Sequence, residues 1–208
     1  MKSHIYLINQ YAILPNGSGG TRHYNLAATL QKQGYDASLV MGSSELNTGK
    51  QSLKGFYLWR SSYVGPVQVV TIKTFPVVGN SIYRILGMIS FSVILFLFLI
   101  SHQLPKPKSI YFSSTPQPFA CLAAYLASCI RRTFFVLEIR DLWPESLFSL
   151  GIMSSKSLIG QLLHHLDLYL VRKSSIVFTL LSNASKYYCN FGIEPSKFVY
   201  LPNGVDPI

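Results

Sequence analysis

The sequence predicts an α/β fold with a doubly wound parallel sheet, and three observations support this prediction. Short apolar stretches that suit strands alternate with longer stretches at helical spacing along the 208 residues. The first of the strand stretches leads into a glycine-rich turn and a helix, which begins a βαβ unit. Hydrophobic residues make up 49% of the chain and charged residues only 12%, so the chain can bury a substantial core. The length fits one large domain or two small ones.

The N-terminal residues contain the clearest βαβ unit. The apolar stretch His4–Ile8 is expected to form the first strand, and Tyr24–Gln33 carries its apolar residues at helical spacing. Gly34 follows in the position that ends many helices, and Asp36–Met41 is the second expected strand. A strand, a helix and a strand in this order imply parallel pairing with a right-handed crossover.

The rest of the chain continues the alternation of strands and helices. Residues 42–53 are polar and are expected to form a loop. Further strands are expected at 56–60, 67–72, 109–113, 133–139, 175–180 and 198–201, and further helices at 119–129, 157–171 and 184–191. Alternation of this kind is typical of a doubly wound Rossmann-like sheet.

One segment, Ile85–Ser101, is seventeen residues long and carries no charge. A helix that spans a bilayer needs about twenty residues, and a span here would place the two halves of one sheet on opposite sides of a membrane. We therefore exclude a transmembrane helix. Two alternatives stay open: a helix buried on the sheet, or a helix that packs partly on the sheet and dips into the membrane interface. Arg84, Lys106 and Lys108 flank the segment and would favour anionic headgroups.

The composition restricts the possible partners. The formal net charge is +10, which suits nucleic acid, an anionic membrane or an anionic substrate. There is no Lys/Arg-rich run, zinc-finger spacing or RNA-binding aromatic motif, so we expect no nucleic acid. The three cysteines lack metal-ligand or redox spacing, and the first residues lack a signal-peptide pattern. We therefore expect a cytoplasmic protein without a metal site.

Ligands of doubly wound sheets bind beyond the carboxyl ends of the strands. That rule selects Asn16–His23, Ser113–Pro118 and Arg140–Glu145. The second stretch contains the candidate site residues Thr115 and Gln117.

The first stretch belongs to PNGSGGTRHYNLA, which fits neither the P-loop pattern nor the dinucleotide-binding pattern. Its glycines still allow a tight turn with free N–H groups at a helix start, where anions bind well. We expect Gly19, Gly20, Thr21 and Arg22 to bind a diphosphate or a sugar, with a plain flexible loop as the alternative. His23 has no partner pattern and is expected to be an ordinary helix or surface residue.

The third stretch follows the most apolar strand, and three of the eight acidic residues of the chain lie within 138–145. Charge beside such a strand is costly unless it is paired or used. We expect Asp141 to be a functional-site residue. The alternative is a structural pair between Glu138 and Arg140, which share one face of the strand.

Four motifs together carry a resemblance to a known family: GSGGTRHYNLAATLQKQGYDASLV, SSTPQPF, VLEIRDLWPESLFSLGI and VYLPNGVDP. In their order and spacing the chain resembles the N-terminal domain of retaining GT-B glycosyltransferases of the family-four type. It is similar in particular to bacterial aminosugar transferases of O-antigen and capsule assembly. Many members carry a histidine where this chain has Arg140 and Asp141, so no histidine-based role carries over.

The resemblance implies a fold, a reaction and partners. Such enzymes pair two Rossmann-like domains and transfer a sugar from a nucleotide-sugar with retention, without a metal or another cofactor. The N-terminal domain holds the acceptor, often a polyprenyl-diphosphate-linked glycan, at the cytoplasmic face of the cell membrane. Its glycine turn, here Gly19 and Gly20, approaches the donor diphosphate or the reacting sugar. On this reading Asp141 is catalytic: it positions the acceptor hydroxyl or accepts its proton, and Glu138 and Arg140 orient it. Thr115 and Gln117 would line the acceptor groove.

The resemblance also implies the domain organisation. Residues 1–202 would form the acceptor-side domain and 203–208 the start of an interdomain linker, with the C-terminal donor domain absent or supplied by a separate chain. We expect such a chain to be inactive alone. Two alternatives are a non-catalytic membrane-associated module that binds a lipid-linked sugar and a nicotinamide-dependent oxidoreductase. The glycine pattern and the placement of Asp36 at a strand start disfavour the oxidoreductase.

Overall fold

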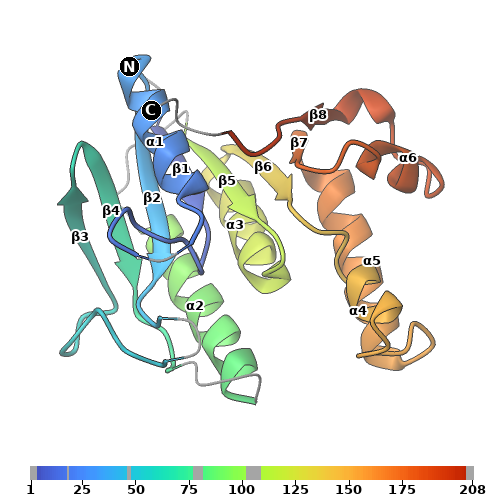
Figure 1. Cartoon of the computed structure of the whole chain (residues 1–208), viewed down its shortest axis with the longest axis horizontal. Coiled ribbons are helices and arrows are strands. Elements are labelled where there is room, and N and C mark those ends of the chain that lie inside the picture. Colours follow the sequence, from blue (N-terminus) through green and yellow to red (C-terminus); the bar gives the residue numbers. More distant parts are fainter. Residues whose placement is uncertain (1–3, 18, 46–47, 77–81, 102–108, 205–208) are drawn as a thin grey trace.

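The computed structural model describes residues 4–17, 19–45, 48–76, 82–101 and 109–204, and one sheet of eight strands organises them (Figure 1). The strand order is β3-β4-β2-β1-β5-β6-β7-β8, and all neighbours pair in parallel except β3 with β4. The strands are β1 (His4–Ile8), β2 (Asp36–Gly42), β3 (Trp59–Val64), β4 (Val67–Ile72), β5 (Ile110–Ser114), β6 (Phe134–Ile139), β7 (Ile176–Thr179) and β8 (Phe198–Tyr200). The predicted doubly wound α/β fold is confirmed.

Helices cover the two faces of the sheet unequally. They are α1 (Arg22–Lys32), α2 (Ile82–Ile100), α3 (Pro118–Arg131), α4 (Glu145–Ser149), α5 (Leu158–Lys173) and α6 (Ala184–Cys189), with a 3₁₀ turn at Pro195–Lys197. One face packs against α2, α3 and α5 through the larger apolar core, whose members include Tyr111, Phe135 and Leu95. The other face packs against α1 through a smaller core that includes Leu7, Ala27 and Leu39.

Helix α2 is apolar all round but only half covered. Phe91, Leu95 and Leu99 are fully buried in the larger core, whereas Ile89 and Val93 on the opposite side are 45% and 55% exposed. Among the described residues, α2 is the one helix long and apolar enough to cross a membrane by length and composition. It packs closely on α3, which belongs to the sheet's helical layer. The helix therefore forms part of the domain and leaves one apolar side on the surface.

Helices α2 and α3 are held together by Gln117. This residue is buried, and its Oε1 accepts from the N–H of Ala120 as the N-cap of α3. Its Nε2 donates to the carbonyl oxygen of Met88 (3.1 Å), to Ser92 Oγ (3.1 Å) and to Gln10 Oε1 (2.8 Å). The start of α3, the middle of α2 and the end of β1 thus share one amide side chain.

The predicted elements match the observed ones in order, with one topological difference. The strand expected at 56–60 is found at Trp59–Val64 and runs antiparallel to β4, because Gly65 adopts φ +54° and turns the chain back as a hairpin. The four central residues of β3 are exposed, so it carries no apolar alternation that would mark its bounds. The short helix α4 was not predicted.

Candidate functional site

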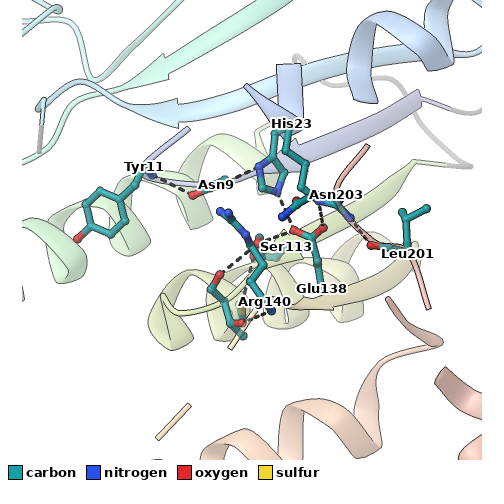
Figure 2. Close-up of polar contacts among 12 residues, drawn as sticks. Asn9, Tyr11, His23, Ser113, Glu138, Arg140, Leu201 and Asn203 are labelled. Atoms are coloured by element: carbon teal, nitrogen blue, oxygen red, sulfur yellow. Dashed lines mark hydrogen bonds and ion pairs between the residues drawn. The ribbon is translucent and has the colours of Figure 1, made fainter. Parts of the chain in front are cut away.

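The strand order places a switch point between β1 and β5. The chain leaves the carboxyl end of β1 toward α1 on one face, and leaves that of β5 toward α3 on the other face. Loops that diverge in this way open the edge of the sheet at the position where doubly wound folds bind ligands. Polar side chains from β1, β5, β6 and α1 converge at this edge (Figure 2).

Glu138 is the centre of that convergence and has no solvent-exposed surface. Its Oε1 accepts from Arg22 Nε at 2.9 Å. Its Oε2 accepts from His23 Nε2 at 2.7 Å and from Ser114 Oγ at 2.7 Å. A buried carboxylate with three donors is satisfied, and it fixes the start of α1 against the ends of β5 and β6.

The pKa of Glu138 reflects these partners. Burial acts to raise the pKa of this carboxyl. The hydrogen bonds from His23 and Ser114 and the positive charge of Arg22 outweigh burial and lower the pKa to about 2. Glu138 is therefore ionised at neutral pH.

His23 is held in one tautomer by the network. The Oδ1 of Asn9 accepts from the main-chain N–H of Tyr11 (3.0 Å), which leaves the Asn9 amide nitrogen to donate to His23 Nδ1 at 3.0 Å. An Nδ1 that accepts requires the ring proton on Nε2, where it is donated to Glu138. His23 lies in a helix, as expected, but it is neither a surface residue nor without partners: it is 3% exposed and hydrogen-bonds to Asn9 and Glu138.

Arg22 connects this cluster to the chain that follows β8. Besides its bond to Glu138, its Nη2 donates to the carbonyl oxygen of Leu201 (2.9 Å) and its Nη1 to that of Pro202 (2.8 Å). Nη1 also approaches Asn203 Oδ1 at 3.5 Å. One guanidinium therefore links Glu138 to residues 201–203, so the position of these residues depends on the ion pair with Glu138.

The glycine turn lies next to this cluster and is exposed. Gly19 has φ +134°, and a Cβ added there would collide with the Ile13 side chain, so this position requires glycine. Gly20 has open space around it. Thr21 is the N-cap of α1, but its side chain makes no capping bond, and the first turn of the helix contains no acidic residue. The predicted diphosphate role of Gly19, Gly20, Thr21 and Arg22 stays a prediction.

Arg140 and Asp141 lie just beyond the end of β6. Asp141 is exposed, and Arg140 is half-buried with its main-chain N–H donating to Thr115 Oγ1 at 3.1 Å. Within the described part of the chain, the alternative Glu138–Arg140 ion pair does not form, and the Glu138 oxygens accept from Arg22, His23 and Ser114 instead. The orienting role of Glu138 and Arg140 stays a prediction. The catalytic role of Asp141 stays a prediction.

Thr115 and Gln117, the expected groove residues, are both buried. The N–H of Thr115 donates to the carbonyl oxygen of Glu138 (2.9 Å), and the amide of Gln117 is used as the cap of α3. Their groove-lining role stays a prediction. No group of three or more His, Cys, Asp or Glu side chains that could hold a metal occurs among the described residues.

Comparison with known proteins defines the fold of the chain. No protein-family model matches it, and no curated protein does. Sucrose-phosphate synthase from Thermosynechococcus elongatus superposes with a TM-score of 0.61 at 7% identity, covering 98% of this chain and 91% of that chain. UDP-GlcNAc 2-epimerase from Methanocaldococcus jannaschii superposes with a TM-score of 0.52 at 12% identity, covering 96% of this chain and 45% of that one. The chain thus has the Rossmann-like α/β fold of GT-B-type domains and spans less than half of the epimerase.

Proposed function

We propose that this chain is the acceptor-side domain of a nucleotide-sugar-dependent, retaining glycosyltransferase of the family-four type. The main observation is the buried Glu138 cluster, which holds an exposed glycine turn and an uncapped helix start at the switch point of the sheet. Two solved proteins with the same fold are named for sugar chemistry, as a synthase of sucrose phosphate and an epimerase of UDP-GlcNAc. The resemblance carried by the four sequence motifs favours the family-four type.

Each group at the edge of the sheet has a role in this proposal. Gly19, Gly20 and the first-turn N–H groups of α1 receive a donor diphosphate or the transferring sugar. Asp141, which is exposed beside the cluster, positions the acceptor hydroxyl or accepts its proton. Glu138 and Arg22 act at one remove by fixing the start of α1. No step in this scheme requires a metal or another cofactor.

In this proposal the described residues supply only part of the donor-binding site. The donors of the Glu138 cluster bind Glu138 itself, so the glycine turn and the first turn of α1 are left to bind a ligand mainly through main-chain N–H groups. We expect the chain alone to bind nucleotide-sugars weakly and to transfer no sugar. Calorimetry with a UDP-sugar tests this, and submillimolar affinity or turnover by the chain alone would contradict it.

The role of Asp141 is tested in an enzyme reconstituted with a donor-binding domain. Asp141→Asn keeps the size of the side chain but removes its charge and basicity, so transfer is expected to fall by about 100-fold or more. Asp36→Asn is the matched control, since Asp36 is an exposed acid at the start of β2, far from the carboxyl ends of the strands. Equal activity of Asp141→Asn and wild type would reduce Asp141 to a surface residue.

We propose further that the acceptor is a polyprenyl-diphosphate-linked glycan and that the domain binds the inner face of the cell membrane through α2. Ile85, Leu86, Ile89, Val93 and Leu97 leave an apolar side of α2 exposed. Between α2 and α3 lies an apolar groove of ≈ 300 Å³, lined by Val93, Phe96, Phe119 and Leu122 among others. Exposed apolar side chains gathered in this way suit an interface with lipid, and the +10 net charge favours anionic headgroups.

Co-sedimentation with anionic liposomes tests the membrane proposal. Wild type is expected in the pellet, and Val93→Asp is expected mostly in the supernatant, because a charge on the inserted side is costly. Ile159→Asp is the matched control, since Ile159 is a comparably exposed apolar residue on α5. Equal recovery of wild type in the supernatant with and without liposomes would contradict the proposal. Pelleting without any transfer by the reconstituted enzyme would favour the non-catalytic lipid-binding module instead.

A further inference from the structure

Arg140 has a buried N–H group with no acceptor. Its Nε is inaccessible to solvent and makes no hydrogen bond within the described residues. The guanidinium also has no carboxylate within 4.0 Å there, since both ion pairs found in that part of the chain belong to Glu138. Figure 2 shows the Arg140 side chain extending from the end of β6 toward Asn9, and so into the edge of the sheet rather than away from it.

The neighbouring acid cannot serve as the missing partner. Glu138 lies two residues earlier, within β6, whereas Arg140 follows the end of that strand. Its two oxygens already accept from Arg22, His23 and Ser114 at 2.7–2.9 Å. The cluster around Glu138 is therefore internally balanced, and the charge of Arg140 is additional to it.

An unsatisfied buried N–H costs about 1–3 kcal/mol, so each such group in a folded protein requires an explanation, and a bound anion is one of them. A guanidinium offers paired donors in a planar fork, which matches the oxygens of a phosphate or diphosphate. Glu138 also brings the start of α1 to this face, and that helix of 11 residues begins with Thr21 uncapped and with no acidic side chain in its first turn. Both features favour an anion at the same edge.

We propose that Arg140 binds the diphosphate group of a substrate at the carboxyl edge of β6, together with the first-turn N–H groups of α1. This inference rests on the proposed glycosyltransferase function and deepens it by naming the side chain that supplies the positive charge. The sequence favoured Arg22 for that task. The three donor nitrogens of Arg22 are committed to Glu138 and to the carbonyl groups of Leu201 and Pro202, whereas Arg140 keeps donors for a ligand.

Titration of the chain with inorganic pyrophosphate, followed by NMR, tests the assignment. Wild type is expected to bind in the millimolar range, and Arg140→Gln is expected to weaken binding at least tenfold. Arg140→Lys should lie between them, since lysine keeps the charge without the fork. Arg60→Gln is the matched control, because it removes the same charge from an exposed position on β3 at the far edge of the sheet. Thermal unfolding of each variant verifies that it is folded.

The possible results separate this inference from the function on which it rests. Equal pyrophosphate affinity of Arg140→Gln and wild type, or no binding to wild type, would overturn the role of Arg140. Sugar transfer by the reconstituted enzyme with normal sensitivity to Asp141→Asn would then still support the function. Arg140-dependent binding of pyrophosphate without any transfer would support the anion site and contradict the glycosyltransferase.

Discussion

The Glu138 cluster and the exposed side of α2 reverse the usual placement of side chains. Glu138 is ionised and 0% exposed, whereas Val93 is apolar and 55% exposed. The carboxylate tolerates burial because three donors from distant parts of the chain surround it. The apolar side of α2 has no comparable cover in the described structure. The polar groups of the Glu138 cluster are satisfied within the domain. The exposed apolar side of α2 has the character of an interaction surface.

The largest expected effect comes from Glu138→Gln. The amide keeps the size of the side chain, but its NH₂ group would face the donors that now bind Glu138, and Arg22 would lose its ion-pair partner. The free energy of unfolding is therefore expected to fall by about 3–5 kcal/mol. Urea denaturation measures the loss. Glu194→Gln, at an exposed acid before the 3₁₀ turn, is the control and should change stability by no more than about 0.5 kcal/mol. A loss of that small size in Glu138→Gln would mean that the cluster is not ionic.

The stability difference between wild type and Glu138→Gln has a predicted pH dependence. The folded pKa of Glu138 is depressed from 4.5 to about 2, so its contribution to stability is fully present above about pH 4.5 and is lost as the pH falls toward 2. Wild type should therefore lose more stability over that acid range than Glu138→Gln does. Parallel curves would contradict the depressed pKa.

A smaller effect separates the two sides of α2. Leu95→Ala empties a fully buried position and is expected to cost about 2–5 kcal/mol. Val93→Ala, two residues earlier on the exposed side, should change the free energy of unfolding by about 0.5 kcal/mol or less in the absence of lipid. A comparable loss for both variants would show that the second side of α2 is also covered.

The smallest effect is expected at Thr21. An N-cap threonine usually contributes about 1 kcal/mol, but the Thr21 hydroxyl makes no capping bond. Thr21→Ala should therefore leave thermal stability nearly unchanged. Gln117→Ala, at the N-cap of α3, removes four hydrogen bonds and is the contrasting variant, with an expected loss of about 1–3 kcal/mol. A clear loss of stability in Thr21→Ala would mean that the Thr21 side chain does cap the first turn of α1.

The order of strands and helices was predictable because it depends on local periodicity. The tightly packed βαβ unit at the N-terminus follows from the apolar spacing of residues 4–41 and from the glycines. The antiparallel β3 was not predicted, because an exposed edge strand needs no apolar pattern. Residues 205–208, which include part of the NGVD motif, lie outside the described residues.

The candidate site was only partly predictable. Charge beside an apolar strand identified Glu138, but its partners Arg22 and His23 lie 116 and 115 residues away in the chain. No local pattern reports a pairing of that range. One usable signal was present in the sequence HYNLAATL, because it places His23 on the same side of the helix as Ala27, which faces the sheet. In α2 the apolar residues occupy all sides, so the sequence could not indicate which side faces solvent.

Arg22 also fixes the direction in which the backbone leaves β8. Its guanidinium holds the carbonyl groups of Leu201 and Pro202, so the backbone departs beside the first turn of α1 rather than swivelling freely from the edge strand. A fluorophore or reporter protein attached beyond this point would inherit a defined starting orientation. Energy-transfer distances from such a label should therefore change in Arg22→Ala, because this variant lacks the hydrogen bonds that hold residues 201 and 202.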